Sequence, residues 1–332
     1  MTKKVGLALG GGSARGWAHI GVIRALEAHD IPIHYVAGTS IGALVGAIYV
    51  SDELHKLEKF ATEINMDTLL AMMDISFPGL GLVDGKHVKE FLYDYLVDTQ
   101  IEASRIPFRC VATNFLAKQE VVFESGSMVD AVRASLSLPG VFAPVKHQDS
   151  YLVDGGVVNP VPVNIVQAMG ADVVIAVNLN HDHRPLSGQS STQSTTTDSQ
   201  SSESPEHSTE TGAIAADSGD DNSAIQDWTE RLTERYQTVK ATLQNQVDDW
   251  MPDPATGINI FDVIGNSINI MEQQVTKVRL ETDVPDILIQ PDLIQFGLFD
   301  FQQAQPLMQR GYDQATSAMP EIKACLDRSA ES

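Results

Sequence analysis

The sequence predicts an α/β fold in which a mainly parallel central sheet is flanked by helices. Two strand–turn–helix units open the chain. Val5–Leu9 leads into the helical periodicity of residues 17–29, and residues 33–37 lead into a small apolar helix over Ile41–Val50. Both turns are rich in glycine. Ala171–Leu179 is almost wholly apolar, which is typical of a strand in the middle of a parallel sheet.

The remaining elements follow from periodicity and from turn residues. Helices are expected over residues 52–73, 85–96, 127–135, 161–169, 258–282 and 302–326, and strands over residues 108–115, 120–124, 151–154 and 286–290. Proline cannot donate the backbone hydrogen bond of a helix interior, so a break is expected at Pro320. Residues 74–82 form a loop rich in apolar side chains, for which a lipid-facing rim and a covered connection both stay open.

Composition restricts the classes of function. A chain of 332 residues suits one large α/β domain or two small ones, and 43% hydrophobic residues support a sizeable core. The 22 Lys and Arg residues are outnumbered by 44 Asp and Glu residues, which gives a formal net charge of −22. Nucleic acid is therefore not expected as a partner, because phosphate binding needs a basic face. The same charge argues against simple electrostatic attraction to anionic lipid.

Cysteine content and hydropathy favour a reduced, cytoplasmic setting. Cys110 and Cys325 provide neither a disulfide framework nor the spacing of a metal site. The apolar stretch near the N-terminus is broken by glycines and by Arg15, so it is neither a signal sequence nor a membrane span. We expect a cytoplasmic location, with peripheral contact at the inner face of the membrane left open.

Composition changes sharply after residue 180. Residues 181–224 are rich in Ser, Thr, Gln, Asp and Glu, and we predict a disordered acidic insert there. Residues 225–256 carry apolar side chains at three- and four-residue steps, which predicts an amphipathic helical segment. The chain is thus divided into a core over residues 1–180, these two segments, and residues 257–332, which complete the domain.

The glycine-rich loop Gly10–Gly16 (G-G-G-S-A-R-G) joins the first strand to the first helix. Such a loop exposes backbone N–H groups to an anion, which is either a phosphate or the oxyanion of an acyl-transfer intermediate. The dinucleotide fingerprint fits poorly. Ser13 or Arg15 stands where it needs a glycine, and no acidic residue ends the second strand. The phosphate-binding loop of nucleotide hydrolases is excluded, because no Gly-Lys-Ser/Thr follows.

Gly38–Gly42 (G-T-S-I-G) joins the second strand to its helix, with Ser40 at the apex. A nucleophilic serine must stand clear of the sheet, and glycines on both sides let neighbouring segments approach it. The alternative is an ordinary tight turn in which Ser40 is only a helix N-cap. The two turns would lie at the carboxyl edge of adjacent parallel strands, which places backbone donors beside a serine.

Asp154-Gly155-Gly156 follows a short apolar strand. An aspartate at a strand end, followed by two glycines, can be held close to another backbone segment, and Asp154 is a candidate base or orienting carboxylate for Ser40. The alternative is a plain turn, since Asp-Gly is a common turn pair.

In this order and spacing the three motifs resemble those of the patatin-like phospholipase family, in particular its small bacterial members. Residues 16–23, 133–142 and 297–301 share the resemblance. It covers residues 5–180 strongly and residues 258–320 moderately. It implies a three-layer patatin-like fold with the nucleophile elbow after the second strand.

The resemblance also implies a Ser–Asp dyad without a catalytic histidine. Ser40 would be the nucleophile and Asp154 the base that takes its proton, while His19 would be structural. The implied oxyanion hole is formed by Gly10, Gly11, Gly12 and Ser13. The implied supporting positions are Arg15, Gly16, Gly38, Gly42, Gly155 and Gly156. No cofactor or metal is implied. Ser13 stands where many members have glycine, and D-G-G stands in place of D-G-A.

The implied function is a serine acyl hydrolase of the phospholipase A, lysophospholipase or esterase type, which cleaves fatty acyl esters of lipids. Its partners would be the lipid ester and, transiently, a membrane surface, with no nucleic acid; the oligomeric state stays open. One alternative is a regulatory or scaffolding protein that retains the fold and works through the acidic insert and the long amphipathic helix. The other is a nucleotide-binding protein, against which the missing acidic residue counts.

Overall fold

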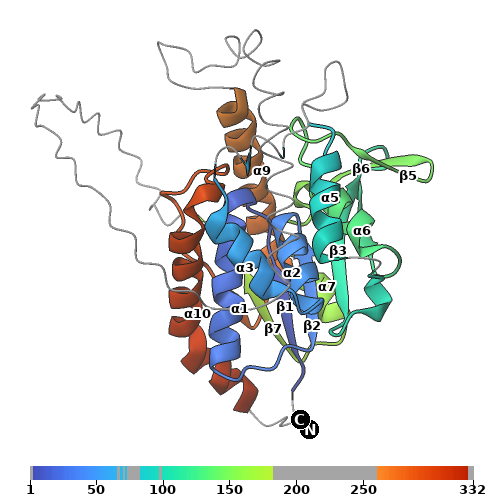
Figure 1. The fold of residues 1–332 in the computed structure, drawn as a ribbon. Helices are drawn as coiled ribbons and strands as arrows, with labels where there is room; N and C mark the ends of the chain where they lie inside the picture. The colour runs from blue at the N-terminus through green and yellow to red at the C-terminus, as the bar shows by residue number, and fades with distance from the viewer. Residues whose placement is uncertain are drawn as a thin grey trace, which may run out of the picture.

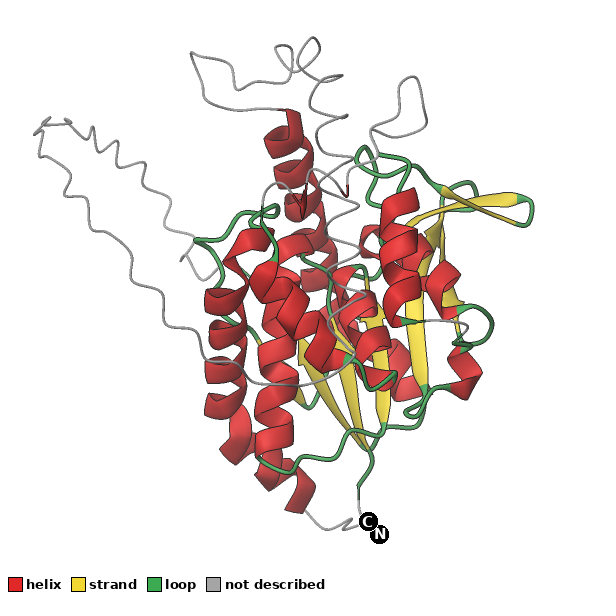
Figure 2. Ribbon diagram, viewed as in Figure 1, coloured by secondary structure: helices red, strands yellow, loops and turns green. Residues whose placement is uncertain are grey.

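The structure is a computed structural model of the chain, and it describes residues 3–65, 68–69, 72, 83–96, 99–181 and 260–327. One central sheet has helices on both faces (Figures 1 and 2). Apart from His181, the predicted acidic insert and amphipathic segment lie outside the described residues, as does the apolar loop over residues 74–82.

The eight described strands form a single, mainly parallel sheet. They are β1 (Val5–Leu9), β2 (Tyr35–Thr39), β3 (Phe108–Asn114), β4 (Gln119–Phe123), β5 (Val145–His147), β6 (Ser150–Asp154), β7 (Val173–Val177) and β8 (Ile287–Ile289). Their order is β5-β6-β3-β2-β1-β7-β8, and β4 pairs with β3. The strands from β3 to β8 in this order pair in parallel, whereas β4 and β6 run antiparallel to β3 and β5 runs antiparallel to β6.

Helices cover both faces of the sheet and create two cores. The helices are α1 (Trp17–Ala28), α2 (Ile41–Val50), α3 (Leu54–Glu63), α5 (Lys86–Tyr95), α6 (Met128–Ser135), α7 (Val163–Ala168), α9 (Ile260–Thr282) and α10 (Ala304–Asp327). Because side chains alternate along a strand, Val5, Leu7 and Leu9 enter the larger core with α1, α2 and α10, while Ala8 enters the smaller core with α7. The predicted three-layer architecture is confirmed.

The helix expected over residues 52–73 is shorter than predicted. It ends at Glu63, because Ile64 has extended backbone angles (φ −62°, ψ 133°). The short strand β5 was not predicted, because its three residues follow a segment interrupted by prolines.

The break expected at Pro320 does not occur, and α10 continues through it. Met319 and Ile322 are buried on both sides of the proline. Their packing holds the helix in place although Pro320 cannot donate one backbone hydrogen bond.

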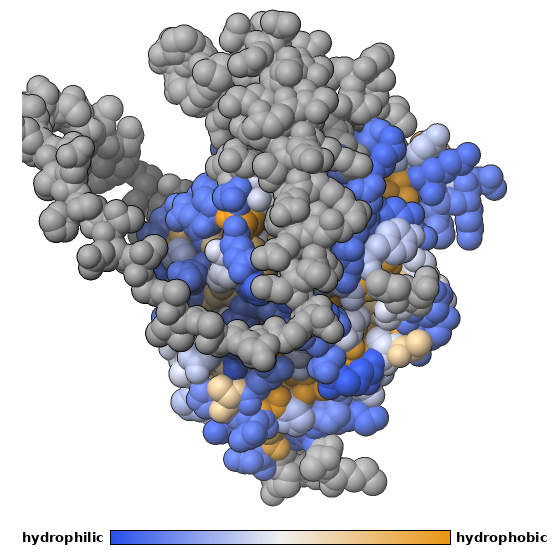
Figure 3. Space-filling model, viewed as in Figure 1, coloured by the Kyte–Doolittle hydropathy of each residue, from blue (hydrophilic) through white to orange (hydrophobic). Residues whose placement is uncertain are grey.

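The described surface is largely polar. In Figure 3 the visible described surface is mainly hydrophilic, with small, separate hydrophobic patches. Within the described part of the chain, no helix is both long and apolar enough to span a membrane.

Helices α1 and α10 lie side by side although they come from opposite ends of the chain (Figure 1). Two glycines permit this close approach. A Cβ atom at Gly21 would overlap the backbone oxygen of Met308, and one at Gly311 would overlap that of Ala18. The C-terminal helix is therefore fixed against the first helix by backbone-to-backbone contact.

Gly311→Ala tests this contact. In a free helix the substitution stabilises by up to about 1 kcal/mol, because alanine has the higher helix propensity. Here the added methyl group would force α1 and α10 apart, and overpacking costs roughly 1–3 kcal/mol. We expect urea unfolding to show a net loss of stability. Ser317→Ala, on the exposed side of α10, is the control and should change stability by less than about 0.5 kcal/mol. A stabilised Gly311→Ala protein would contradict the packing.

Candidate active site

Strands β2 and β6 both pair with the same edge of β3, and the candidate site lies where their ends meet. β4 pairs with Cys110–Asn114 along one edge of β3. β2 and β6 therefore follow one another along the other edge, with Thr39 opposite Val111 and Asp154 opposite Ala112. Since β2 and β6 run in opposite directions, their carboxyl ends point toward each other. This register brings Ser40, the residue after β2, to Asp154.

Ser40 occupies a strained turn between β2 and α2. Its backbone angles are φ 55° and ψ −124°, a region that non-glycine residues rarely adopt. A Cβ atom at Gly38 would overlap the backbone at Gly42 and Ala43, and one at Gly42 would overlap the Leu9 oxygen. The helix can therefore pack tightly on the strands only with glycine at both positions, as expected of a nucleophile elbow.

Ser135, at the end of α6, supports this turn. The Ser40 N–H donates a hydrogen bond of 2.9 Å to Ser135 Oγ, which in turn donates one of 2.6 Å to the Val111 oxygen. The hydroxyl thus satisfies a buried N–H group that the turn withdraws from regular pairing. Sequence reasoning did not identify Ser135 as part of the site.

The predicted contact between Ser40 and Asp154 is confirmed. Ser40 Oγ donates a hydrogen bond of 2.6 Å to Asp154 Oδ2, and the Gly156 N–H donates one of 2.7 Å to Asp154 Oδ1. Only 8% of Ser40 and 1% of Asp154 are exposed. Burial raises the pKa of the Asp154 carboxyl, while the hydrogen bonds from Ser40 and Gly156 oppose that rise. The arrangement is a hydroxyl beside a carboxyl of raised proton affinity.

The glycine-rich loop lies beside Ser40, but it offers fewer free donors than predicted. The Gly10 N–H donates to the Val177 oxygen and the Gly11 N–H to the Pro160 oxygen. These two groups are needed to hold the loop on the sheet, so the expectation that they bind an oxyanion is wrong. Among the described residues, the N–H groups of Gly12 and Ser13 donate to no protein acceptor, and both residues line the pocket at Ser40.

The side chains of Arg15 and His19 both hold this loop in place. Arg15 donates to the Phe296 oxygen at 3.0 Å and to the Asn180 and Asn269 side chains at 3.4 and 3.3 Å. His19 is fully buried, and its Nε2–H donates to the Gly10 oxygen at 2.7 Å. Burial lowers the pKa of His19 to about 4, so the ring is neutral at physiological pH. The structural role expected for His19 agrees with this geometry.

The remaining predicted positions serve close packing. A Cβ atom at Gly16 would overlap the Ile41 side chain, and one at Gly155 would overlap the Val111 oxygen. These glycines let the loop, the elbow and the Asp154 turn approach one another.

An apolar pocket leads to Ser40. Its lining side chains come from α1, α2, α3, α5 and α9 and from the segments that follow α6 and β8. They include Trp17, Leu44, Phe60, Phe91, Phe142, Ile268 and Phe301. A pocket of this composition fits a hydrocarbon chain. Among the described residues, no group of three or more His, Cys, Asp or Glu side chains is arranged to hold a metal ion.

Comparison with known proteins agrees with the sequence resemblance. The model of the patatin-like phospholipase family matches residues 7–166, which contain the loop, the elbow and Asp154. Residues 7–166 belong to the patatin-like phospholipase family. This patatin-like domain is also similar to curated proteins whose names include NTE.

An uncharacterized NTE family protein of Mycobacterium bovis is 38% identical over 177 residues, which are 53% of this chain and 49% of that protein. The lysophospholipase nte1 of Aspergillus fumigatus is 36% identical over 182 residues, 53% of this chain and 12% of that protein. The match therefore spans about half the length of the first relative and less of the second. Among solved structures, VipD from Legionella pneumophila aligns over 98% of this chain and 67% of its own with a TM-score of 0.42 and 12% identity, too distant a similarity to carry an argument.

Helix α9 brings a further carboxyl group to the patatin-like domain from outside residues 7–166. Glu272 lines the pocket together with Ser40 and is only 6% exposed. Its Oε2 accepts a hydrogen bond of 2.7 Å from Asn180 Nδ2. Sequence reasoning missed it. The available signal was an acidic residue on the buried face of a periodic helix, four residues after the buried Ile268.

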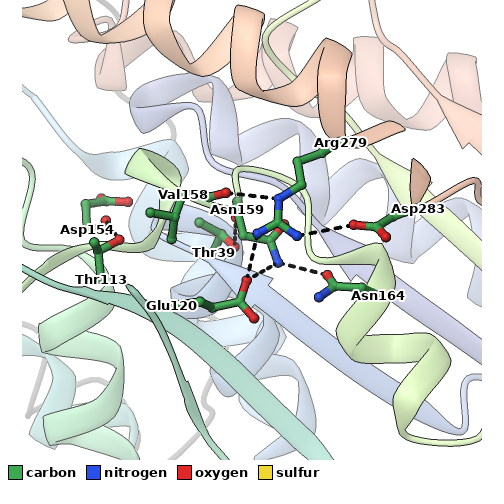
Figure 4. Close-up of polar contacts among 9 residues, drawn as sticks. All are labelled: Thr39, Thr113, Glu120, Asp154, Val158, Asn159, Asn164, Arg279 and Asp283. Carbon is green, nitrogen blue, oxygen red and sulfur yellow. Dashed lines mark hydrogen bonds and ion pairs between the residues drawn. The ribbon is translucent and has the colours of Figure 1, made fainter. Parts of the chain in front are cut away.

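A second polar cluster fixes α9 to the turn that carries Asp154 (Figure 4). Arg279 donates to the Val158 oxygen at 3.1 Å and forms ion pairs with Glu120 and Asp283, both at 3.3 Å. Asn159 donates to the same Glu120 at 2.8 Å. Helix α9 is thereby held to the patatin-like domain about two turns beyond Glu272.

Ser135→Ala tests the support of the elbow. The substitution leaves the buried Ser40 N–H without an acceptor, and such a group costs about 1–3 kcal/mol. We expect a loss of unfolding free energy in this range, measured by chemical denaturation. Ser51→Ala is the matched control, because the buried Ser51 hydroxyl has no partner among the described residues. Equal effects of the two substitutions would show that the Ser135 hydroxyl does not support the turn.

Proposed function

We propose that this protein hydrolyses fatty acyl esters of lipids through Ser40 and Asp154. The observation that carries the proposal is the 2.6 Å hydrogen bond from the Ser40 hydroxyl to a buried carboxyl group at a strained elbow. The apolar pocket that Ser40 lines supports an acyl chain as part of the substrate. Membership of residues 7–166 in the patatin-like phospholipase family supports the same class of substrate.

In the first half of the proposed reaction, Ser40 Oγ attacks the ester carbonyl and its proton passes to Asp154. The N–H groups of Gly12 and Ser13 receive the negative charge on the carbonyl oxygen. Each such donor contributes about 2.7–4 kcal/mol to catalysis in other hydrolases. When the tetrahedral intermediate collapses, Asp154 returns the proton to the leaving alcohol, and the acyl group stays on Ser40.

In the second half, water attacks the acyl-enzyme while Asp154 accepts one of its protons. The second intermediate collapses with release of the fatty acid, and Asp154 returns the proton to Ser40 Oγ. One carboxyl group thus acts in turn as base and acid, so the cycle needs no imidazole. We propose further that the lipid substrate is reached at a membrane surface through transient contact.

Ser40→Ala and Asp154→Asn should each lower hydrolysis of a short-chain p-nitrophenyl ester by more than about 1,000-fold, because the nucleophile or its base is lost. A fluorophosphonate should label Ser40 in the wild-type protein. Asp149→Asn, in an exposed turn beyond β5, is the control for Asp154→Asn and should retain full activity. A folded protein that neither reacts with the probe nor cleaves esters would instead favour a regulatory or scaffolding role.

Hydrolysis should depend on pH through Asp154. The carboxyl must be ionised to accept the Ser40 proton, and burial raises its pKa. Activity should therefore fall on acidification while exposed carboxyl groups are still ionised. The measurement is kcat/KM against pH, with circular dichroism at each point to confirm that the protein stays folded. An acid limb at the pKa of an ordinary exposed aspartate would contradict the assignment of Asp154 as the base.

A further inference from the structure

Glu272 lines the pocket beside Ser40, and its Oε1 lies close to Gly11 and Gly156. A Cβ atom placed on Gly11 would lie 3.5 Å from Ser40 Cβ and 3.7 Å from Glu272 Oε1. Both are ordinary van der Waals contact distances. Because Gly11 has no Cβ atom, a space of about one heavy atom lies between Ser40 and Glu272 Oε1. A Cβ atom on Gly156 would overlap Glu272 Oε1 and lie 3.2 Å from Asp154 Oδ1. Oε1 therefore borders both members of the dyad.

The surrounding hydrogen bonds determine which oxygen of Glu272 can carry a proton. Arg15 can only donate, so its contact with Asn180 Oδ1 fixes the orientation of that amide. Asn180 Nδ2 must then donate to Glu272 Oε2, which acts as an acceptor. Oε1 makes no hydrogen bond to any described residue. In the protonated acid, the O–H group is thus at Oε1 and points to the dyad.

The charges around Glu272 favour this protonated form. Among the described residues, Asp154 and Arg15 are the charged groups that act on it. Burial raises the pKa of the Glu272 carboxyl and the negative charge of Asp154 raises it further, while the Asn180 hydrogen bond and Arg15 oppose the rise. Two neighbouring buried carboxyl groups cannot both ionise readily, so the first charge suppresses the second. Asp154 accepts hydrogen bonds from Ser40 and Gly156, which makes it the member that ionises first.

On the basis of the proposed function, we propose that Glu272 is a third functional group of the site. It is a carboxylic acid whose Oε1–H donates a hydrogen bond to the oxygen of the leaving alcohol and then to that of the hydrolytic water. Both oxygens must pass beside Asp154, since Asp154 exchanges a proton with each. Glu272 keeps its own proton throughout, and only Ser40, Asp154 and the substrate exchange protons. Deprotonation removes the donor and places a negative charge against oxygen lone pairs, which slows both steps.

The first test is Glu272→Gln followed by thermal unfolding as a function of pH, which needs no activity. A carboxyl that keeps its proton in the folded state destabilises that state as pH rises from the usual glutamate pKa through the raised one. The amide that this substitution introduces cannot ionise. We expect the melting temperature of the variant to exceed that of the wild type by a margin that grows to a few °C across this window and vanishes below it. Glu281→Gln, an exposed position of the same helix, should show no growing margin.

The second test is the pH dependence of p-nitrophenyl ester hydrolysis, in which a leaving alcohol and a hydrolytic water both take part. Above the Glu272 pKa the wild-type rate should fall about tenfold per pH unit, as expected when one protonated group is required. Glu272→Gln should remove this alkaline limb, because its NH2 group can donate in place of Oε1–H while its oxygen accepts from Asn180. Glu272→Ala should be slow at every pH, because it lacks the donor.

The outcomes separate the inference from the proposed function. Wild-type and Glu272→Gln proteins with the same pH dependence of melting would show an ionised Glu272 and overturn the inference. A growing stability margin with coincident alkaline limbs would show a protonated group that does not act in the reaction, and would overturn its catalytic role. Absence of labelling and hydrolysis in the wild type would overturn the proposed function and this role with it, while the melting data would still decide the protonation state.

Discussion

The hydrogen bond from Ser40 to Asp154 imposes the main constraint on this structure. It requires that β2 and β6 end at the same point on one edge of β3, with Thr39 and Asp154 opposite consecutive residues. A slip of either register by one residue would turn the side chains to the other face of the sheet and separate the pair. The strained backbone of Ser40 is maintained by contacts on three sides: the glycines of the turn, Ser135, and Asp154 itself.

Burial raises the pKa of Asp154 in this pair, and it also costs folding free energy because a polar pair is removed from water. In the apolar surroundings of the pocket, the ionised carboxyl is poorly solvated, so its proton affinity rises toward that of an effective base. In the proposed reaction, the same surroundings would strengthen the hydrogen bonds of the Gly12 and Ser13 N–H groups to an oxyanion. Nearby polar groups are engaged in fixed roles: His19 is neutral and bonded to the loop, and Arg15 links the loop to α9. The charged and polar side chains around the pair are therefore held in place by hydrogen bonds.

Local patterns predicted the parts of the site, whereas its long-range contacts required the structure. Strand–turn–helix units and glycine spacing located the elbow, the loop and the Asp154 turn, because each depends on a few consecutive residues. Those patterns do not reveal which backbone N–H groups already donate hydrogen bonds within the fold. Gly10 donates to Val177 and Gly11 to Pro160, about 170 and 150 residues away in the sequence. Ser135 and Glu272 were missed for the same reason, since their roles arise from partners far along the chain.

Gly156 illustrates how such a long-range partner limits a short motif. In the family that this chain resembles, the aspartate motif occurs as D-G-G or as D-G-A. In this chain, where the third residue is Gly156, a methyl group at that position would overlap the Glu272 carboxyl. The residue after Asp154-Gly155 is therefore constrained by a helix more than a hundred positions later. Arg279 holds the backbone of that helix against the same turn, so a methyl group at position 156 would have to be accommodated by rotation of the Glu272 side chain, which moves Oε1 from its place beside the dyad. Glycine at position 156 and glutamate at position 272 thus form one structural unit, and a change at either position alters the space beside the dyad.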